Sequence, residues 1–193
     1  MGKVVRRLWH LGGGVLFPLL AFFVPRGVLL VALGVVTGVF LAAESIRLVL
    51  PGVNRWLLRF FSAAMKERES FWLTGSSYLL LSSLLVFLLF EREVAITSLL
   101  FLAVADPAAA TIGERFGKRR VFGKSLEGSL ACLGACLGVG ILLSRVSLGI
   151  APWGILAGAV SATVMELLPI PLDDNFTIPL FSAGAMTLMG LVC

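Results

Sequence analysis

Asp106 is an acidic residue within a long apolar segment, and small residues follow it at helical spacing. In a helix, Ala110, Gly113 and Gly117 would share a face with Asp106 and leave a groove beside its carboxylate. Packing of small residues between helices would explain the glycines but not the aspartate, because a carboxylate in an apolar helix is costly unless it faces a partner or a polar cavity. The segment therefore predicts a polar site at Asp106.

A loop rich in positive charge follows this segment. It carries a basic run and then a short glycine–lysine–serine sequence: Lys118, Arg119, Arg120, Gly123, Lys124 and Ser125. Glycine lets backbone N–H groups approach a phosphate, lysine adds a positive charge, and a helix N-terminus adds a partial one. The spacing excludes a Walker-type P-loop, which has four residues between its glycines and follows a β-strand, whereas five residues separate Gly117 from Gly123. A basic loop that only sets topology is the alternative, but Asp106 and Glu127 nearby favour an anion-binding loop.

A second acidic group comprises Glu166, Asp173 and Asp174, with Pro169 and Pro171 between its members. Because the prolines interrupt the helix, these carboxylates can converge without following helical spacing. Two or three carboxylates beside a phosphate-binding loop are what a Mg²⁺–nucleotide site needs. The alternative role is N-capping of the last helix by Asp173 or Asp174, and we expect one of the two to cap it.

Other polar residues have simpler interpretations. His10 stands alone at the start of the first apolar segment, where a histidine is more often a structural hydrogen-bonding residue than a catalyst. Glu44 and Arg47, at the end of the second, could form a helix-end ion pair. Cys132 and Cys136 lie one helical turn apart in an apolar segment, which is typical of small packing residues.

The composition indicates the class of protein that must position these residues. The chain has 193 residues, of which 59% are hydrophobic and 14% are charged, and its mean hydropathy is +1.02. These values exclude a soluble domain and favour a single membrane-embedded catalytic domain over residues 1–193. The net charge of +5 does not indicate nucleic-acid binding, because the basic residues lie between apolar segments and form no separate domain.

We expect an all-α, polytopic integral membrane protein with about seven transmembrane helices. The predicted spans are residues 8–24, 27–43, 71–90, 94–112, 126–143, 150–168 and 176–193. The first resembles a signal peptide but lacks a cleavage site, so it is expected to be a retained helix. Pro18 and Pro107 inside spans predict kinks. Residues 54–70 alternate apolar and basic positions, which predicts one amphipathic helix in the headgroup region, with a solvated loop as the alternative.

The basic residues predict the orientation. With the N-terminus inside, only Arg26, Arg92 and Arg145 of the 16 Lys and Arg face outward, which leaves 13 on the cytoplasmic side. This bias predicts an N-in, C-out topology. The same topology places most acidic residues at the cytoplasmic side, so one polar face would hold the site. The lack of a targeting segment suits a prokaryotic cytoplasmic membrane.

Four motifs are spread over most of the chain. They are Arg6-Arg7-x-x-His10; Thr74-Gly75-x-x-Tyr78; the central run Asp106-x-x-Ala109-x-x-x-Gly113-x-x-x-Gly117 with Gly123-Lys124-Ser125-x-Glu127-Gly128-Ser129-x-Ala131; and Glu166 with Asp174-Asn175-x-x-Ile178-Pro179. Together they resemble the motifs of the CTP-dependent lipid kinases, which comprise dolichol kinases, phytol kinases and CTP-dependent diacylglycerol kinases. Pro107 and Ser125 depart from the commoner pattern, which has small or hydroxyl residues and threonine at these positions.

The resemblance implies transfer of the γ-phosphoryl group of CTP to the hydroxyl of a lipid alcohol, assisted by Mg²⁺. It implies nucleotide binding by the loop and its flanking glycines: Gly113, Gly117, Arg119, Arg120, Gly123, Lys124, Ser125 and Gly128. It implies catalytic roles for Asp106, Lys124, Glu127 and His10, and metal binding by Asp106, Glu166 and Asp174. The lipid could be a polyprenol such as dolichol, phytol or geranylgeraniol, or diacylglycerol. The oligomeric state, a homo-oligomer included, is left open.

Two other functions are consistent with parts of the sequence. A phosphatidate cytidylyltransferase-like enzyme would use the same nucleotide and metal but attack the α-phosphate, although its acidic C-terminal signature is absent. A small-solute transporter would need acidic residues near the middle of the membrane and broken helices in paired halves. The gathering of acidic residues at one face disfavours a transporter.

Overall fold

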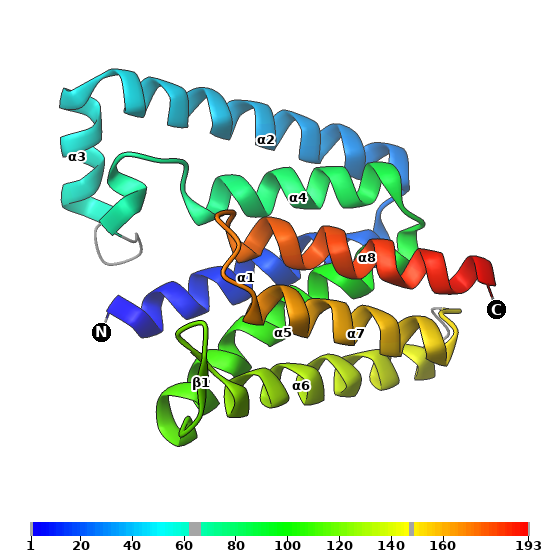
Figure 1. The fold of residues 1–193 in the computed structure, drawn as a ribbon. Helices are drawn as coiled ribbons and strands as arrows, with labels where there is room; N and C mark the ends of the chain where they lie inside the picture. The colour runs from blue at the N-terminus through cyan, green and yellow to red at the C-terminus, as the bar shows by residue number, and fades with distance from the viewer. Residues whose placement is uncertain (1, 62–66, 147–148, 193) are drawn as a thin grey trace.

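The computed structural model describes residues 2–61, 67–146 and 149–192, with the side chains of residues 2–10, 61, 67, 68 and 192 outside that description. The chain is all-α except for one short hairpin (Figure 1). Its elements are α1 (Gly2–Phe23), α2 (Arg26–Val49), α3 (Pro51–Phe61), a 3₁₀ turn (Glu67–Ser70), α4 (Gly75–Leu89), α5 (Arg92–Phe116), β1 (Arg120–Val121), β2 (Lys124–Ser125), α6 (Leu126–Arg145), α7 (Pro152–Leu167) and α8 (Asp174–Val192).

Each predicted span corresponds to one helix, although the boundaries differ. Helix α2 continues past residue 43 to Val49, and α5 continues through Pro107 to Phe116. Helix α4 begins at Gly75 rather than at residue 71, because the Thr74 side chain accepts a hydrogen bond from the Ser77 N–H and caps the helix. Proline precedes α2 and opens α7, where its missing N–H leaves no helical bond unmade.

Among the described residues, three helices are long and apolar enough to cross a membrane: α2, α5 and α6. The segment Leu11–Phe23, α4 and α7 are shorter apolar helices. Helix α2 exposes Val31, Val35 and Val39, and such an outward apolar face is expected where lipid replaces water. These features indicate a membrane protein.

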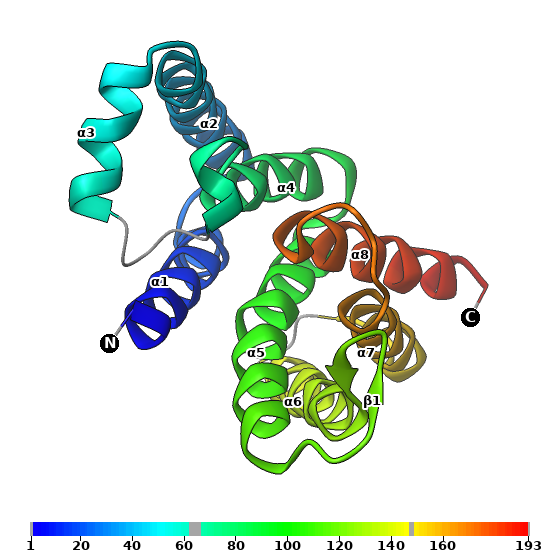
Figure 2. The same cartoon turned by 60° about the vertical axis from the view of Figure 1, so that its left-hand side comes forward.

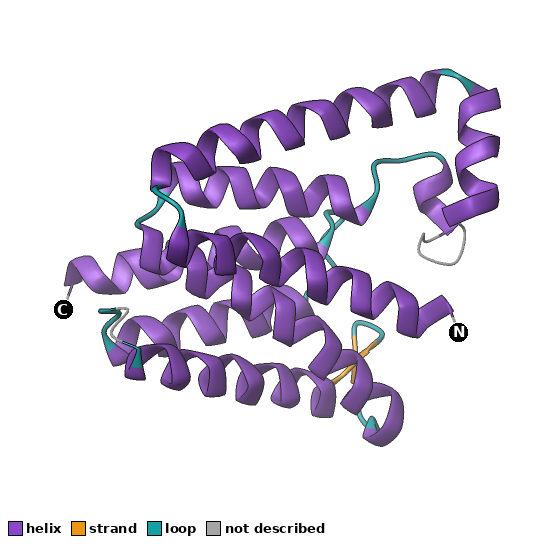
Figure 3. Ribbon diagram, turned by 180° about the vertical axis from the view of Figure 1, so that it is seen from behind, coloured by secondary structure: helices purple, strands orange, loops and turns teal. Residues whose placement is uncertain are grey.

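The long helices run roughly side by side and alternate in direction, so that the two chain ends lie at opposite ends of the bundle (Figures 1 and 3). Helix α5 lies at the centre and packs against α1, α6, α7 and α8 (Figure 2). Phe101 and Leu99 of α5 are fully buried in the two apolar clusters that form the core. The alternation brings the C-terminal ends of α5 and α7 beside the N-terminal ends of α6 and α8.

The predicted amphipathic helix at residues 54–70 is described only in part. Helix α3 covers Pro51–Phe61 and the 3₁₀ turn covers Glu67–Ser70, while residues 62–66 lie outside the described part. Helix α3 runs crosswise to α2 at the C-terminal end of that helix instead of alongside it (Figure 1). Trp56 and Phe60 on this helix are exposed, and their ring centroids lie 5.0 Å apart.

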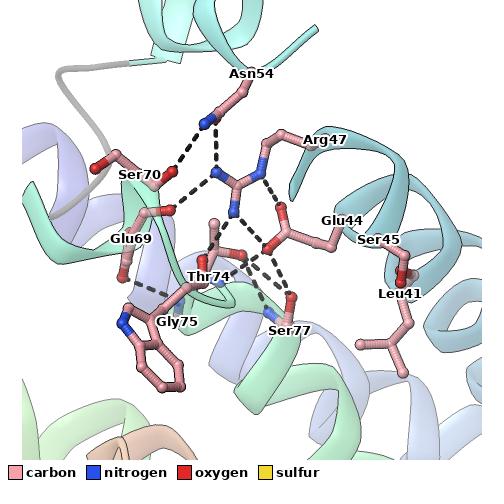
Figure 4. A network of polar contacts seen from close by, with 11 residues as sticks. Leu41, Glu44, Ser45, Arg47, Asn54, Glu69, Ser70, Thr74, Gly75 and Ser77 are labelled. Carbon is pink, nitrogen blue, oxygen red and sulfur yellow. Dashed lines mark hydrogen bonds and ion pairs between the residues drawn. The ribbon is translucent and has the colours of Figure 1, made fainter. Parts of the chain in front are cut away.

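The predicted ion pair between Glu44 and Arg47 is confirmed and extends into a larger buried network (Figure 4). Arg47 Nε and Nη2 donate to the two Glu44 carboxylate oxygens at 2.9 and 3.0 Å. The remaining Arg47 donors bind Asn54 Oδ1 and the backbone carbonyls of Glu69 and Trp72 at 2.9–3.0 Å. The network thereby joins the end of α2 to α3 and to the segment before α4.

Candidate functional site

A cleft of about 230 Å³ opens at the end of the bundle where α5, α6, α7 and α8 meet. It is lined by Asp106, Ala109, Ala110, Gly113, Glu114, Arg120, Gly123, Lys124, Ser125, Gly128, Glu166 and Asp174. Nine of these residues were predicted from the sequence to form the site. The segments around residues 106–128 and 166–174 are therefore brought together as expected.

A two-stranded hairpin between α5 and α6 carries the basic residues. Arg120 pairs with Ser125 and Val121 pairs with Lys124, so that Phe122 and Gly123 form a two-residue turn. Both turn residues have positive φ, at 52° and 84°, as a type I′ turn requires. Glycine adopts this conformation readily, whereas phenylalanine is rare there. Little in the sequence pointed to the hairpin, because neither asparagine nor aspartate occupies the turn.

Lys124 extends from the hairpin to the acidic group on the other side of the cleft. Its Nζ donates to Asp174 Oδ2 at 3.2 Å and lies 3.6 Å from Glu166 Oε1. It also donates to the backbone carbonyl of Glu166. The predicted lysine and two of the predicted acidic residues therefore contact one another directly.

Glu166 is buried near the C-terminal end of α7, and a serine orients its carboxylate. Ser129 Oγ donates to Glu166 Oε2 at 3.3 Å, and the same hydroxyl lies 3.3 Å from the Ser125 carbonyl. Ser125 is the N-cap of α6, since its side chain accepts the Gly128 N–H at 3.0 Å. Ser129 belongs to the central motif but was not singled out from the sequence.

Asp173 and Asp174 divide their roles as expected. The Asp173 carboxylate accepts the N–H of Asn175 at 3.1 Å, which is an N-capping contact at the start of α8. Asp174 is left to face Lys124. Asp174 precedes the predicted span at residues 176–193, and burial raises the pKa of its carboxyl above the ordinary value while the Lys124 ammonium opposes this rise.

Asp106 is half-buried at the cleft wall and makes no hydrogen bond or ion pair to the described residues. Its position one turn before Ala109 and Ala110 leaves open space beside the carboxylate, as the spacing predicted. A half-buried carboxylate that faces a cleft without a partner can accept a proton or bind a cation brought by a ligand.

The spacing of the glycines has a packing explanation. A Cβ at Gly128 would lie 2.7 Å from the Ala109 carbonyl, and a Cβ at Gly113 would lie 2.6 Å from Ser125 Oγ. A Cβ at Gly117 would lie 2.3 Å from the Gly113 carbonyl. These glycines allow α5, α6 and the hairpin to approach closely. Gly113 and Gly128 still line the cleft, but Gly117 does not.

Two more predicted residues, Glu127 and Arg119, do not line the cleft. Glu127 faces the loop instead, where its carboxylate accepts the backbone N–H groups of Lys118 at 3.1 Å and Arg119 at 3.3 Å. Arg119 contributes its backbone to that contact. His10 lies in α1, and its side chain is outside the described part, as are those of Arg6 and Arg7. The contacts of Glu127 with the Lys118 and Arg119 backbone hold the loop that leads into the hairpin.

The described residues contain no group of three or more His, Cys, Asp or Glu side chains placed to hold a metal ion. Asp106, Glu166 and Asp174 thus line one cleft without forming a ready-made metal cage. The oxygen atoms of Glu166 and Asp174 that surround Lys124 are nevertheless the donor type that Mg²⁺ prefers. Mg²⁺ is commonly held by one or two carboxylates together with substrate phosphates, and this donor set fits that arrangement.

Comparison with known proteins finds related chains. An uncharacterized protein of Rickettsia prowazekii is 29% identical over 185 residues, which cover 91% of this chain and 88% of that protein. The CTP-dependent diacylglycerol kinase 1 of Schizosaccharomyces pombe is 30% identical over 165 residues, or 76% of this chain and 74% of that enzyme. The enzyme of the same name from Saccharomyces cerevisiae is 29% identical over 170 residues, or 72% of this chain.

The match spans 57% of the length of the Saccharomyces cerevisiae enzyme. No family model and no solved structure matches the chain. The extent of the match to the Schizosaccharomyces pombe enzyme, together with the convergence of the motif residues on one cleft, places the chain: it belongs to the CTP-dependent lipid kinase family.

Proposed function

We propose that this protein transfers the γ-phosphoryl group of CTP to the hydroxyl of a membrane lipid, giving CDP and a lipid phosphate. The observation that supports this most is the cleft, in which a lysine on a hairpin, an aspartate without a hydrogen bond to the described residues, and two further carboxylates meet at one end of an apolar bundle. Diacylglycerol is the first acceptor to test, because three relatives are named diacylglycerol kinases. Polyprenols, phytol and geranylgeraniol are the other acceptors.

The cleft residues have distinct roles in this proposal. Lys124 and Arg120 bind phosphate oxygens and neutralise their charge. Asp106 accepts the proton of the lipid hydroxyl while the lipid oxygen bonds to the γ-phosphorus. The bond between the γ-phosphorus and the β-phosphate oxygen breaks, and CDP leaves. Glu166 and Asp174 would hold Mg²⁺, which supplies charge neutralisation on the phosphates when bound. Glu127 positions the loop.

The membrane topology is part of the same proposal. Seven helices would span the bilayer with the N-terminus inside, so that the cleft faces the cytoplasm, where CTP is found. The alternation of the long helices and the crosswise position of α3 at the end of α2 support this arrangement (Figure 1). A lipid hydroxyl at the bilayer surface would then meet the nucleotide at the cleft. We place the protein in a prokaryotic cytoplasmic membrane.

The test uses purified protein in detergent with Mg²⁺, lipid alcohols, and CTP labelled at either the α- or the γ-phosphate. We expect the γ label to enter the lipid. Label entering only from the α position, and only with a lipid phosphate as acceptor, would instead identify a cytidylyltransferase. Transfer of neither label would contradict both enzyme functions and direct attention to transport.

Asp106→Asn tests the catalytic assignment. Removing a general base should lower turnover about 10²- to 10⁴-fold while leaving the fold intact. The matched control is Glu93→Gln, the same carboxylate-to-amide change in the first turn of α5 at the opposite end of the helix, which should retain activity. Near-native turnover in the Asp106→Asn variant would remove Asp106 from the proposed mechanism.

A further inference from the structure

Lys124 occupies the position at which a divalent cation would be expected. Its ammonium group faces three oxygen atoms, which are Asp174 Oδ2 at 3.2 Å, Glu166 Oε1 at 3.6 Å and the backbone carbonyl oxygen of Glu166. The Lys124 side chain is only 33% exposed, so this is a contact within the cleft wall. The three oxygens come from two helices, α7 and α8, that an irregular segment joins.

The fold itself makes this position attractive to a cation. Two carboxylates that face the same cleft repel each other unless a positive charge stands between them, and Glu166 is the more buried of the two. The Glu166 carbonyl belongs to the last turn of α7, where carbonyls lack helical partners and the helix dipole is negative. Ser129 fixes the second Glu166 oxygen from the other side.

We infer that Lys124 is the resident cation of the Glu166–Asp174 pair, and that a divalent metal gains access to these oxygens only when Lys124 moves to the phosphates of a nucleotide. The metal role rests on the proposed function. Metal and nucleotide then bind together, whereas the metal alone binds weakly. Arg120, which lines the same cleft, remains available to the phosphates in either state.

Binding of Mn²⁺ to the full chain in detergent, measured by the electron paramagnetic resonance signal of free Mn²⁺, tests this inference without lipid or CTP. We expect weak binding to the native protein. Lys124→Met keeps the length of the side chain but removes the charge, and it should bind Mn²⁺ at least about tenfold more tightly. The matched control is Lys118→Met in the same loop, because the Lys118 side chain is exposed and outside the cleft.

Two further measurements complete the test. Lys124→Met combined with Glu166→Gln should lose the gain in Mn²⁺ affinity, which would locate the metal at these oxygens. Adding CDP to the native protein should increase Mn²⁺ binding. This measurement uses the native protein alone, so it does not depend on whether a variant folds. Native Mn²⁺ binding without CDP as tight as that of Lys124→Met would overturn the inference, as would a folded Lys124→Met variant with no gain, or no effect of CDP.

The inference and the proposed function fail in different ways. If the protein transfers no phosphoryl group but the Lys124→Met variant gains Mn²⁺ affinity, the resident-cation role of Lys124 stands and the kinase function is wrong. If the native protein phosphorylates lipid but binds Mn²⁺ tightly without nucleotide, the kinase function stands and the resident-cation role of Lys124 is wrong.

Discussion

Loss of the Arg47 guanidinium should destabilise the protein strongly. Arg47 is 2% exposed, and its five N–H groups are all used, two by Glu44 and one each by Asn54, Glu69 and Trp72 (Figure 4). Arg47→Met would retain most of the apolar stem and remove every one of these contacts. It would also leave the Glu44 carboxylate, which is 6% exposed, without a counter-charge.

The expected magnitude follows from these contacts. Removing one partner of a buried ion pair costs about 3–5 kcal/mol. Loss of the three hydrogen bonds to neutral acceptors adds about 1 kcal/mol each before relaxation. Because the Thr74 N–H at 2.9 Å and the Ser77 hydroxyl at 3.3 Å still stabilise Glu44, we expect a relaxed total of about 5 kcal/mol. That is a large part of the stability of a typical domain.

Equilibrium unfolding in mixed detergent micelles, followed by tryptophan fluorescence, measures this change. Adding Glu44→Gln to Arg47→Met should restore about 2 kcal/mol, because the uncompensated charge is then gone. The control Arg55→Met removes an exposed arginine of α3 and should change stability by less than about 0.5 kcal/mol. If Arg47→Met unfolded within about 1 kcal/mol of the native protein, the network would not hold the end of α2 to α3, and the reasoning would be refuted.

Three other substitutions test particular contacts. Gly128→Ala should cost about 1–3 kcal/mol in the same unfolding assay, because its Cβ would lie 2.7 Å from the Ala109 carbonyl, whereas Gly134→Ala on the same helix meets nothing within 4 Å and should be neutral or stabilising. Thr177→Val should stabilise the protein by about 1 kcal/mol, because the buried Thr177 hydroxyl has no partner among the described residues; a loss of stability would reveal one. Glu127→Gln should keep phosphoryl transfer within about tenfold of native, since one oxygen still accepts the loop N–H groups, while loss of about 10²- to 10⁴-fold would mean that Glu127 acts as an acid or base.

The helical architecture was predictable because its signal is local. Each apolar segment of about 20 residues becomes one helix, and prolines and capping residues set the ends. The end of α2 was placed too early because Glu44 and Arg47 are polar and therefore looked like the membrane boundary. Their burial depends on partners at positions 54, 69 and 72, which no local pattern shows.

The members of the site were more predictable than their geometry. A carboxylate in an apolar helix and a glycine–lysine–serine turn each signal chemistry by residue type. The contact between Lys124 and Asp174 spans 50 positions and depends on the packing of α6, α7 and α8, so the sequence could not show that the lysine meets the acidic group directly. The Phe122–Gly123 turn carried no asparagine or aspartate signal, and the hairpin was missed for that reason.

The same cleft therefore contains two classes of residue that mutation should separate. Gly113 and Gly128 are needed where α5 and α6 approach, so their substitution acts on stability first. Asp106 makes no hydrogen bond or ion pair to the described residues, and its substitution should act on turnover with little change in stability. Lys124 belongs to neither class, because it contacts the Glu166–Asp174 pair and is also the proposed phosphate-binding residue. Its loss should therefore change stability, metal affinity and turnover together, which no purely structural or purely catalytic residue of the cleft would do.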